Sequence, residues 1–255
     1  MTESLLKVKQ LVKHFPITGG LLGRVVDKVH AVDGVSLELD AGQTLGVVGE
    51  SGCGKSTTVR CILRLIEPTS GEVWFEGRDV TAMGKTELRG MARDMQIIFQ
   101  DPYASLNPRM TVGAIVGEAL IIHKLTKTAS QYQDRIVELL ETVGLSADQM
   151  RRYPHEFSGG QRQRIGIARA LYKQADVIIF DEATSALDNE TEHAVMQAIE
   201  SLSKDLTLLI IAHRLTTLKN CTQIVELGAG GIMRAGNYQE IVNQSVIATQ
   251  KNKEN

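Results

Sequence analysis

The sequence contains no hydrophobic run long enough to cross a membrane. Its longest uninterrupted apolar runs, such as residues 177–180 and 208–212, are far shorter than the roughly 18 residues that a transmembrane helix needs. The first ten residues also have neither the long apolar core nor the small-residue cleavage site of a secretory signal. We therefore expect a chain that does not insert into a membrane and that stays in the cytoplasm.

Cysteine is scarce and the net charge is small. The three cysteines, Cys53, Cys61 and Cys221, are odd in number and lack the paired spacing of metal ligands, so we expect neither a disulfide nor a structural zinc site. Charged residues make up 23% of the 255 residues but leave a formal net charge of only −2. Without a strongly basic field, we expect no nucleic acid as the main partner.

The apolar content of 43% suffices for a sizeable core in one large domain or in two closely joined lobes. Short alternating apolar stretches and turn-forming glycines in the first 45 residues predict an antiparallel sheet. Near-continuous apolar runs are instead typical of parallel strands covered on both faces, and they occur at residues 44–49, 95–100, 177–182 and 208–213. Helical periodicity predicts an α-helical insert between the second and third of these strands.

A glycine-rich phosphate-binding loop follows the first apolar strand. Residues 49–57 read GESGCGKST and fit the pattern G-x-x-x-x-G-K-[ST], and a helical stretch is expected over residues 55–66. In such a loop, backbone N–H groups surround the β-phosphate and the helix N-terminus adds a favourable field. Lys55 is expected to bridge the β- and γ-phosphates of ATP, and Ser56 to bind Mg²⁺. The other predicted nucleotide contacts in the loop are Gly49, Glu50, Ser51, Gly52, Cys53, Gly54 and Thr57.

Two carboxylates end the strand at residues 177–182, whose sequence is VIIFDE. Acidic side chains at the end of a buried strand are costly unless they face a cation or solvent. Asp181 is therefore predicted to organise Mg²⁺, and Glu182 to polarise the attacking water. Together with the phosphate loop, these residues predict a nucleoside triphosphatase without specifying its kind.

A third motif specifies the kind of triphosphatase. Residues 157–171 read FSGGQRQRIGIARAL and place an SGG element directly before a helix, which is a second anion-binding helix N-terminus. With SGGQ between the phosphate loop and the carboxylate strand, the sequence resembles the ABC (ATP-binding cassette) ATPase family over about residues 5–234. The resemblance implies an α/β fold of the P-loop NTPase type, with an ABC-type ATPase core, an N-terminal antiparallel β subdomain and an α-helical insert.

The resemblance also implies a composite site. In that family, two subunits bind head to tail, and the SGGQ element of one closes over ATP held by the P-loop of the other. This role in trans would fall to Ser158, Gly159, Gly160 and Gln161.

Further site residues rest on the resemblance alone. Gln100 matches the Q-loop glutamine that senses Mg²⁺ and the attacking water, and His213 matches the switch histidine that contacts the γ-phosphate. Asp188 belongs to a sequence that matches the D-loop at the dimer interface. Phe15 is the candidate for stacking on adenine, although burial in a strand explains this residue equally well.

We expect one ABC ATPase domain over residues 1–255. Residues 1–99 and 166–235 would form the catalytic core with the antiparallel subdomain, residues 100–165 the helical subdomain, and residues 236–255 a C-terminal helix or tail.

The front and the rear of the chain resemble different branches of the family. The front, which includes AVDGVSLELDAGQTLGVVGESGCGKST and RRYPHEFSGGQRQR, is similar to the ATPases of dipeptide and oligopeptide importers. The rear, with DEAT where those importers commonly have DEP, looks like the nucleotide-binding domains of exporters. We hypothesise a chimera with a crossover within residues 159–171. The alternative is a natural lineage that drifted toward both patterns.

The leading functional interpretation is ATP hydrolysis by a head-to-tail dimer, formed with a second copy or a related ATPase subunit, with ATP and Mg²⁺ as cofactors. Membrane-spanning transporter subunits would be further partners, with the chain peripheral at the inner face of the membrane and docked through the helical insert. Two alternatives stay open: an engineered ABC ATPase that binds ATP without a transport partner, and a soluble ABC ATPase of DNA repair or translation. The latter usually has a long coiled-coil insertion or tandem cassettes, which this sequence lacks.

Overall fold

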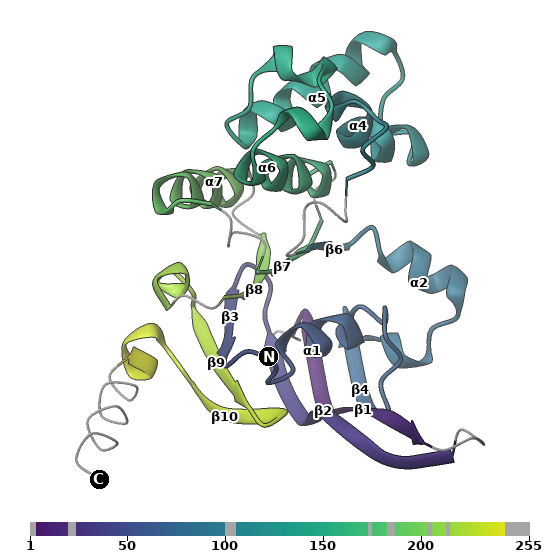
Figure 1. Cartoon of the computed structure of the whole chain (residues 1–255), viewed down its shortest axis with the longest axis vertical. Coiled ribbons are helices and arrows are strands. Elements are labelled where there is room, and N and C mark those ends of the chain that lie inside the picture. The colour runs from purple at the N-terminus through teal and green to yellow at the C-terminus, as the bar shows by residue number, and fades with distance from the viewer. Residues whose placement is uncertain are drawn as a thin grey trace. The chain divides into compact units, whose positions relative to one another are not determined.

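The computed structural model describes residues 4–19, 24–99, 106–172, 175–182, 187–202, 206–212 and 215–242. The chain divides into two compact units, Met1–Met95 with Thr207–Asn255, and Gln96–Leu206. Figure 1 shows strands dominating the first unit and helices dominating the second. None of the described helices is both long and apolar enough to span a membrane.

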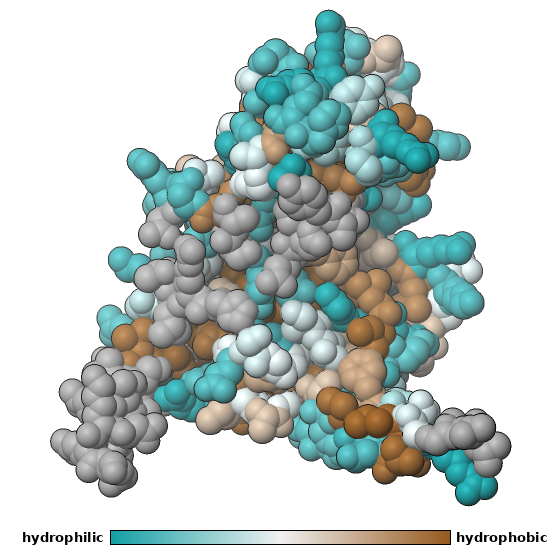
Figure 2. Space-filling view, in the orientation of Figure 1, coloured by the Kyte–Doolittle hydropathy of each residue, from teal (hydrophilic) through white to brown (hydrophobic). Residues whose placement is uncertain are grey.

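An antiparallel sheet in the order β2-β1-β4-β5 opens the first unit. Its strands are β1 (Leu6–Gly19), β2 (Arg24–Leu39), β4 (Ser70–Phe75) and β5 (Arg78–Asp79). Leu6 pairs with Leu39, and both side chains are buried. Residues directly opposite each other in a sheet lie on the same face. Toward the other end of the ribbon formed by β1 and β2, apolar side chains are exposed instead, and Figure 2 shows hydrophobic atoms on the surface there.

The parallel part of the first unit centres on β3 (Thr44–Gly49). This strand lies between β8 (Thr207–Ile211) and β9 (Gln223–Gly228) and runs parallel to both, while β10 (Gly231–Gly236) pairs antiparallel with β9. Leu45 and Leu209 are fully buried, as expected for parallel strands covered on both faces. The carboxyl end of β3 leads directly into the glycine-rich loop and α1 (Lys55–Ile62).

Helix α1 ends at Ile62 rather than at residue 66 as predicted. Arg64 adopts a positive φ of 51°, and the N–H groups of Leu65 and Ile66 both donate to the carbonyl oxygen of Arg60. The guanidinium of Arg64 also donates to backbone carbonyls near η1 (Val80–Ala82), which precedes α2 (Lys85–Met91). Tertiary hydrogen bonds that periodicity does not reveal therefore end the helix early.

The second unit packs four helices beside two short strands. The helices are α4 (Val112–Ile122), α5 (Ala129–Thr142), α6 (Gly159–Ala170) and α7 (Asn189–Leu202), and the 3₁₀ helices η2 (Ala147–Arg151) and η3 (Pro154–Glu156) precede α6. Helices α4, α5 and α6 pack against one another through buried side chains such as Leu120, Ile136 and Ile165. Strand β7 (Val177–Asp181) is buried throughout and neighbours β6 (Met95–Ile98).

The predicted fold class is confirmed, because the antiparallel sheet, the buried parallel strands and the helices between β6 and β7 are all present. The short helix η4 (Leu215–Leu218) follows β8. Most of the predicted C-terminal helix or tail, from residue 243 onward, lies outside the described residues.

Candidate functional site

The phosphate loop needs glycine at both of its ends. Gly54, which precedes α1, has a φ of 100°, and a Cβ atom there would lie 2.0 Å from the carbonyl oxygen of Ala31. At Gly49, a Cβ atom would lie 2.3 Å from the carbonyl oxygen of Leu227. Both distances are far below any van der Waals contact, so the loop is held against β2 and β9 in a shape that a larger residue would disrupt.

Lys55 is the buried cation of this loop. Lys55 is only 4% exposed. Its Nζ atom donates hydrogen bonds to the carbonyl oxygens of Gly49 at 2.8 Å and Glu50 at 2.9 Å. A buried ammonium group requires such partners because its desolvation is costly. The bonds hold the positive charge at the first turn of α1, where the helix N-terminus also favours an anion.

The remaining loop residues suit a polyphosphate ligand. Glu50, Ser51 and Gly52 are exposed, and a Cβ atom at Gly52 would meet no atom within 4 Å. Ser56 and Thr57, in the first turn of α1, are half-buried. The structure therefore brings the predicted residues 49–57 together as a loop and the first turn of α1, which combine an ammonium group, hydroxyls and a helix N-terminus.

Cysteine chemistry is not suggested by this loop. Cys53 is buried, with Sγ 3.9 Å from the Nζ atom of Lys55. Cys61 lies beyond the loop, in α1. Burial raises the pKa of its thiol to about 11, which keeps that thiol protonated and unreactive at neutral pH.

Phe15 lies in β1 of the same unit and is 37% exposed. A fully buried strand phenylalanine is therefore ruled out as the explanation of this residue. The Nζ atom of Lys13 lies 4.9 Å from the centroid of the Phe15 ring, a cation–π distance. The ring is thus partly exposed, with an ammonium group over it, and its role as an adenine platform stays a prediction.

Asp181 ends the fully buried strand β7, and Glu182 follows it directly. Asp181 is 2% exposed and Glu182 is 8% exposed. Glu182 has a φ of 53°, a left-handed conformation that costs a residue other than glycine about 1–3 kcal/mol. The same conformation occurs at five other described residues that are not glycine, so it does not by itself mark a site; carboxylate oxygens are, however, ligands that Mg²⁺ prefers.

The SGGQ element begins α6 with a reciprocal cap. The Ser158 hydroxyl oxygen accepts from the N–H of Gln161 at 3.3 Å, and Gln161 Oε1 accepts from the N–H of Ser158 at 3.0 Å. This capping box directs the start of the helix. Gly159 is different, because a Cβ atom there would meet nothing within 4 Å. Nothing among the described residues explains why position 159 holds a glycine.

Asp188 caps the next helix. Its Oδ1 accepts from the N–H of Thr191 at 2.8 Å, and its Oδ2 accepts from the Thr191 hydroxyl at 2.8 Å. The hydrogen bond from the Thr191 backbone holds the pKa of Asp188 below its usual range. The side chain thus stabilises the start of α7, in addition to the interface role that the resemblance implies.

Gln100 and His213 lie outside the described residues, so their roles stay predictions. The phosphate loop and Phe15 belong to the first unit, and Ser158, Asp181 and Glu182 belong to the second. The structure therefore describes the surroundings of each of these two groups of side chains within its own unit.

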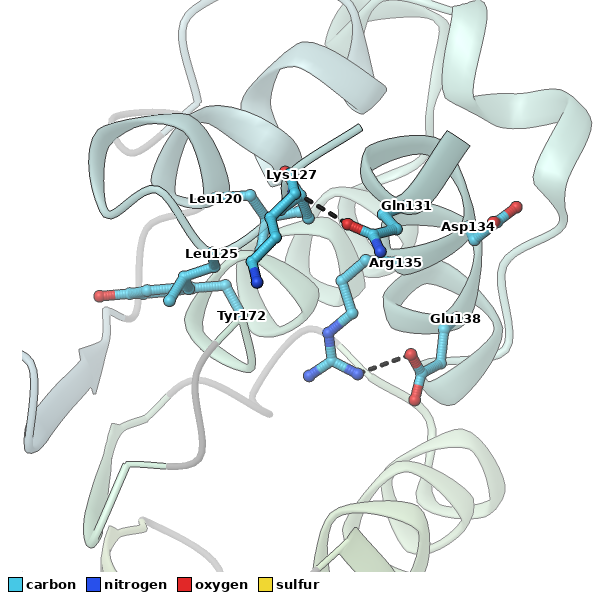
Figure 3. Close-up of a pocket in the computed structure, with 9 residues that line it drawn as sticks. Leu120, Leu125, Lys127, Gln131, Asp134, Arg135, Glu138 and Tyr172 are labelled. Atoms are coloured by element: carbon cyan, nitrogen blue, oxygen red, sulfur yellow. Dashed lines mark hydrogen bonds and ion pairs between the residues drawn. The ribbon is translucent and has the colours of Figure 1, made fainter. Parts of the chain in front are cut away.

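The second unit also has a pocket of about 520 Å³ between α4 and α5. Figure 3 shows Leu125 and Tyr172 on one side and the polar side chains of α5 on the other, where Arg135 and Glu138 form an ion pair of 2.6 Å. Ile121 and Ile122, which follow the lining residue Leu120 at the end of α4, are 64% and 65% exposed.

Sequence reasoning missed one cluster of side chains in the first unit. His14, His30 and Asp33 place a ligand atom each within 4.8 Å of one another. The sequence carried no signal for the cluster, because it depends on the register between β1 and β2.

The comparisons with known sequences point to one family. Residues 32–185 match the family described as ABC transporter. The chain is 50% identical to the oligopeptide transport ATP-binding protein OppF of Bacillus subtilis, in an alignment of 244 residues that covers 94% of this chain and 76% of that protein. It is 43% identical to the glutathione import ATP-binding protein GsiA of Pectobacterium atrosepticum, in an alignment of 242 residues that covers 94% of this chain and 39% of that protein.

Solved structures share the fold. The dimeric ATP-binding cassette MJ0796, in a post-hydrolysis state bound to ADP and Pi, superposes with a TM-score of 0.83 at 28% identity, over 91% of this chain and 98% of that one. A bacterial Atm1-family ABC exporter with ATP bound superposes with a TM-score of 0.75 at 24% identity, over 96% of this chain and 41% of that one. At that identity, the exporter shows the fold alone.

The hypothesis of a chimera finds no support. The similarity to OppF covers 94% of the chain, so it extends on both sides of the proposed crossover at residues 159–171. An importer ATPase thus matches the last third as well as the front. The family match over residues 32–185 and the identity to importer ATPases lead to the same conclusion: this chain belongs to the ABC transporter family, as an ATP-binding cassette.

Proposed function

We propose that this chain binds ATP with Mg²⁺, hydrolyses ATP as one half of a head-to-tail dimer, and thereby drives import of small peptides through membrane-spanning partner subunits. The observation that carries the catalytic part is the buried Lys55 ammonium, held by two carbonyls at the end of β3. The names of the similar proteins, which refer to oligopeptide transport and glutathione import, support the transport part over a soluble role in DNA repair or translation.

Nucleotide binding would use the first unit. The Lys55 ammonium would exchange its carbonyl partners for oxygens of the β- and γ-phosphates, and the open side of the loop at Gly52 leaves room for them. Phe15 would stack on the adenine. Ser56 and Asp181 would hold Mg²⁺, which neutralises charge on the phosphates.

Hydrolysis would depend on Glu182. Glu182 follows the predicted Mg²⁺ ligand Asp181 directly, and its backbone has a φ of 53°. A carboxylate in a fixed position orients and polarises the attacking water. Predicted contacts from Gln100 and His213 would complete the surroundings of the γ-phosphate.

Completion of the site would require a second subunit. Ser158 and Gln161 already cap α6 within the chain, whereas Gly159 has open space where a Cβ atom would lie. A glycine without an internal reason is expected where another molecule approaches the backbone closely. We assign that molecule as the ATP bound to the partner's phosphate loop, facing the N-terminus of α6.

Mixing two inactive variants tests the composite site. Lys55→Ala removes the phosphate cation, and Ser158→Arg blocks the SGGQ surface, so each variant alone should lose turnover. Equal amounts mixed together should recover up to about a quarter of the parent turnover, because random pairing makes half of the dimers mixed and each mixed dimer has one complete site of two.

The control is a cross-linking or size measurement that shows mixed dimers with ATP. Mixed dimers without recovered turnover would refute action in trans. Unchanged ATP affinity in Lys55→Ala would count separately against the phosphate-loop assignment.

Docking to membrane subunits is assigned to the helical unit. Ile121 and Ile122 at the end of α4 are exposed, and they follow Leu120, which lines the pocket between α4 and α5; exposed apolar residues are candidates for a contact with another protein. These two isoleucines are the proposed contact for the membrane-spanning partner.

A further inference from the structure

We propose that His14, His30 and Asp33 form a binding site for a divalent transition-metal ion of the Zn²⁺ class, on the ribbon formed by β1 and β2. The three side chains place ligand atoms within 4.8 Å of one another. The cluster differs from the phosphate loop in its ligands, because it offers two imidazoles and one carboxylate. Imidazole nitrogen is a ligand that Zn²⁺ prefers and that Mg²⁺ does not.

A β-bulge creates the cluster. His14 pairs with His30, but the preceding residue Lys13 pairs with Val32, so that Ala31 is left over on β2. Val12 then pairs with Asp33. Residues directly opposite each other lie on the same face of a sheet, and Val12 and His14 share a face because they are two apart. The bulge therefore places His30 and Asp33, three residues apart, on one face with His14.

The separations between the imidazole nitrogens and the two oxygens of the Asp33 carboxylate are longer than hydrogen bonds and close to the spacing of ligands around a metal ion. His14 Nε2 lies 3.5 Å from Asp33 Oδ1, and His30 Nδ1 lies 3.6 Å from Asp33 Oδ2. Both exceed the usual 2.7–3.2 Å of an N–H···O bond. In a tetrahedral zinc site with ligand bonds of about 2.0–2.2 Å, neighbouring ligand atoms are roughly 3.3–3.5 Å apart. Small rotations of these side chains would complete such a geometry.

His14 supplies an independent indication of a ligand. Its Nε2 atom is buried and has no hydrogen-bond partner among the described residues. A buried polar atom without a partner is destabilising, and a metal ion bound by that nitrogen would remove this cost. The ring centroids of His14 and His30 lie 3.9 Å apart, so the two imidazoles are close enough to share one ion.

The backbone holds two of the ligands in place. The N–H of His14 donates to the Thr69 hydroxyl at 2.9 Å, and the N–H of Asp33 donates to the carbonyl oxygen of Gly230 at 2.8 Å. The side chains of His30 and Asp33 are 55% and 54% exposed, which gives an ion a path from solvent. Three protein ligands leave a fourth position for water or another donor.

Titration of the nucleotide-free full chain with Co²⁺, which substitutes for Zn²⁺ and has visible absorption bands, tests the proposal. We expect one strong site with tetrahedral-type bands that Zn²⁺ abolishes by competition. His14→Gln with His30→Gln should weaken this site at least tenfold, whereas the matched exchange His155→Gln with His193→Gln, outside the cluster, should not.

A thermal measurement keeps the test independent of ATP turnover and of variant folding. Zn²⁺ should raise the melting temperature of the parent chain, and that increase should be lost in Asp33→Asn, which retains the size of the side chain. Binding of equal strength in the histidine pair variant, or the absence of a Co²⁺ site in the parent, would overturn the proposal.

Discussion

Two glycines of α6 provide a direct test of the composite site. At both Gly159 and Gly166, a Cβ atom would meet nothing within 4 Å, so alanine fits sterically at either position within this chain. If a second subunit brings nucleotide to the start of α6, the two positions should differ in function while both remain tolerant in folding. Gly159→Ala and Gly166→Ala are therefore matched variants.

The expected stability changes follow from helix propensity. Gly166 lies in the interior of α6 (Gly159–Ala170), where alanine is favoured over glycine by about 0.5–1 kcal/mol. For a chain of this size that is an increase of about 1–4 °C in melting temperature. Gly159 is the first residue of the helix, where propensity matters less, so its variant should lie within about 0.5 kcal/mol of the parent.

Gly54→Ala should instead be strongly destabilising, because the Cβ atom has no room there. Its φ of 100° and the 2.0 Å approach of the Ala31 carbonyl oxygen combine a left-handed backbone penalty of about 1–2 kcal/mol with an overpacking penalty of about 1–3 kcal/mol. We expect a loss of about 2–5 kcal/mol, measured by urea unfolding with calorimetry as a check.

Turnover should separate the two helix variants. Gly166→Ala should hydrolyse ATP at the parent rate. Gly159→Ala should lose at least about tenfold, equivalent to about 1.4 kcal/mol in the barrier, and Gly159→Asp should lose more because its carboxylate would face the γ-phosphate of the partner's ATP. Parent-like turnover in both position 159 variants would refute the composite site. Equal losses in Gly166→Ala would show that open space is a poor criterion for tolerance.

Three further predictions follow from the same structure. Glu182→Gln should keep ATP affinity but lose about 10²–10⁴-fold in turnover, and it should run as a dimer with ATP and as a monomer with ADP in size-exclusion chromatography; turnover at the parent rate would show that Glu182 is not the base. Ile121→Asp with Ile122→Asp should leave ATP binding intact and weaken co-purification with the membrane subunits, whereas Leu65→Asp, at a residue 57% exposed in the other unit, should not; equal effects would remove the docking assignment. The Asp188 cap lowers the pKa of that carboxyl in the folded state, so its contribution to stability is present above the ordinary pKa of about 3.9 and is lost as the pH falls through the lower folded value; acid unfolding of Asp188→Asn should lack this step, and an unchanged acid profile would contradict it.

The continuous motifs were readable from the sequence because their chemistry is local. Residues 49–57 form a phosphate loop through the spacing of glycine, lysine and serine, and the capping box at Ser158 and Gln161 follows from a three-residue separation. Buried parallel strands were recognisable from uninterrupted apolar runs. These features depend on backbone geometry over a few residues, so the fold class and the family resemblance could be predicted before any tertiary contact was known.

Other properties depended on contacts between distant parts of the chain. The end of α1 at Ile62 reflects hydrogen bonds from Arg64 to a later segment. The need for glycine at position 54 comes from the carbonyl of Ala31 on another strand. The histidine cluster exists because a bulge shifts the register of β1 against β2. A strand pattern specifies alternation but not register, and register decides which side chains meet, so tertiary structure alone could place His14 beside His30 and Asp33.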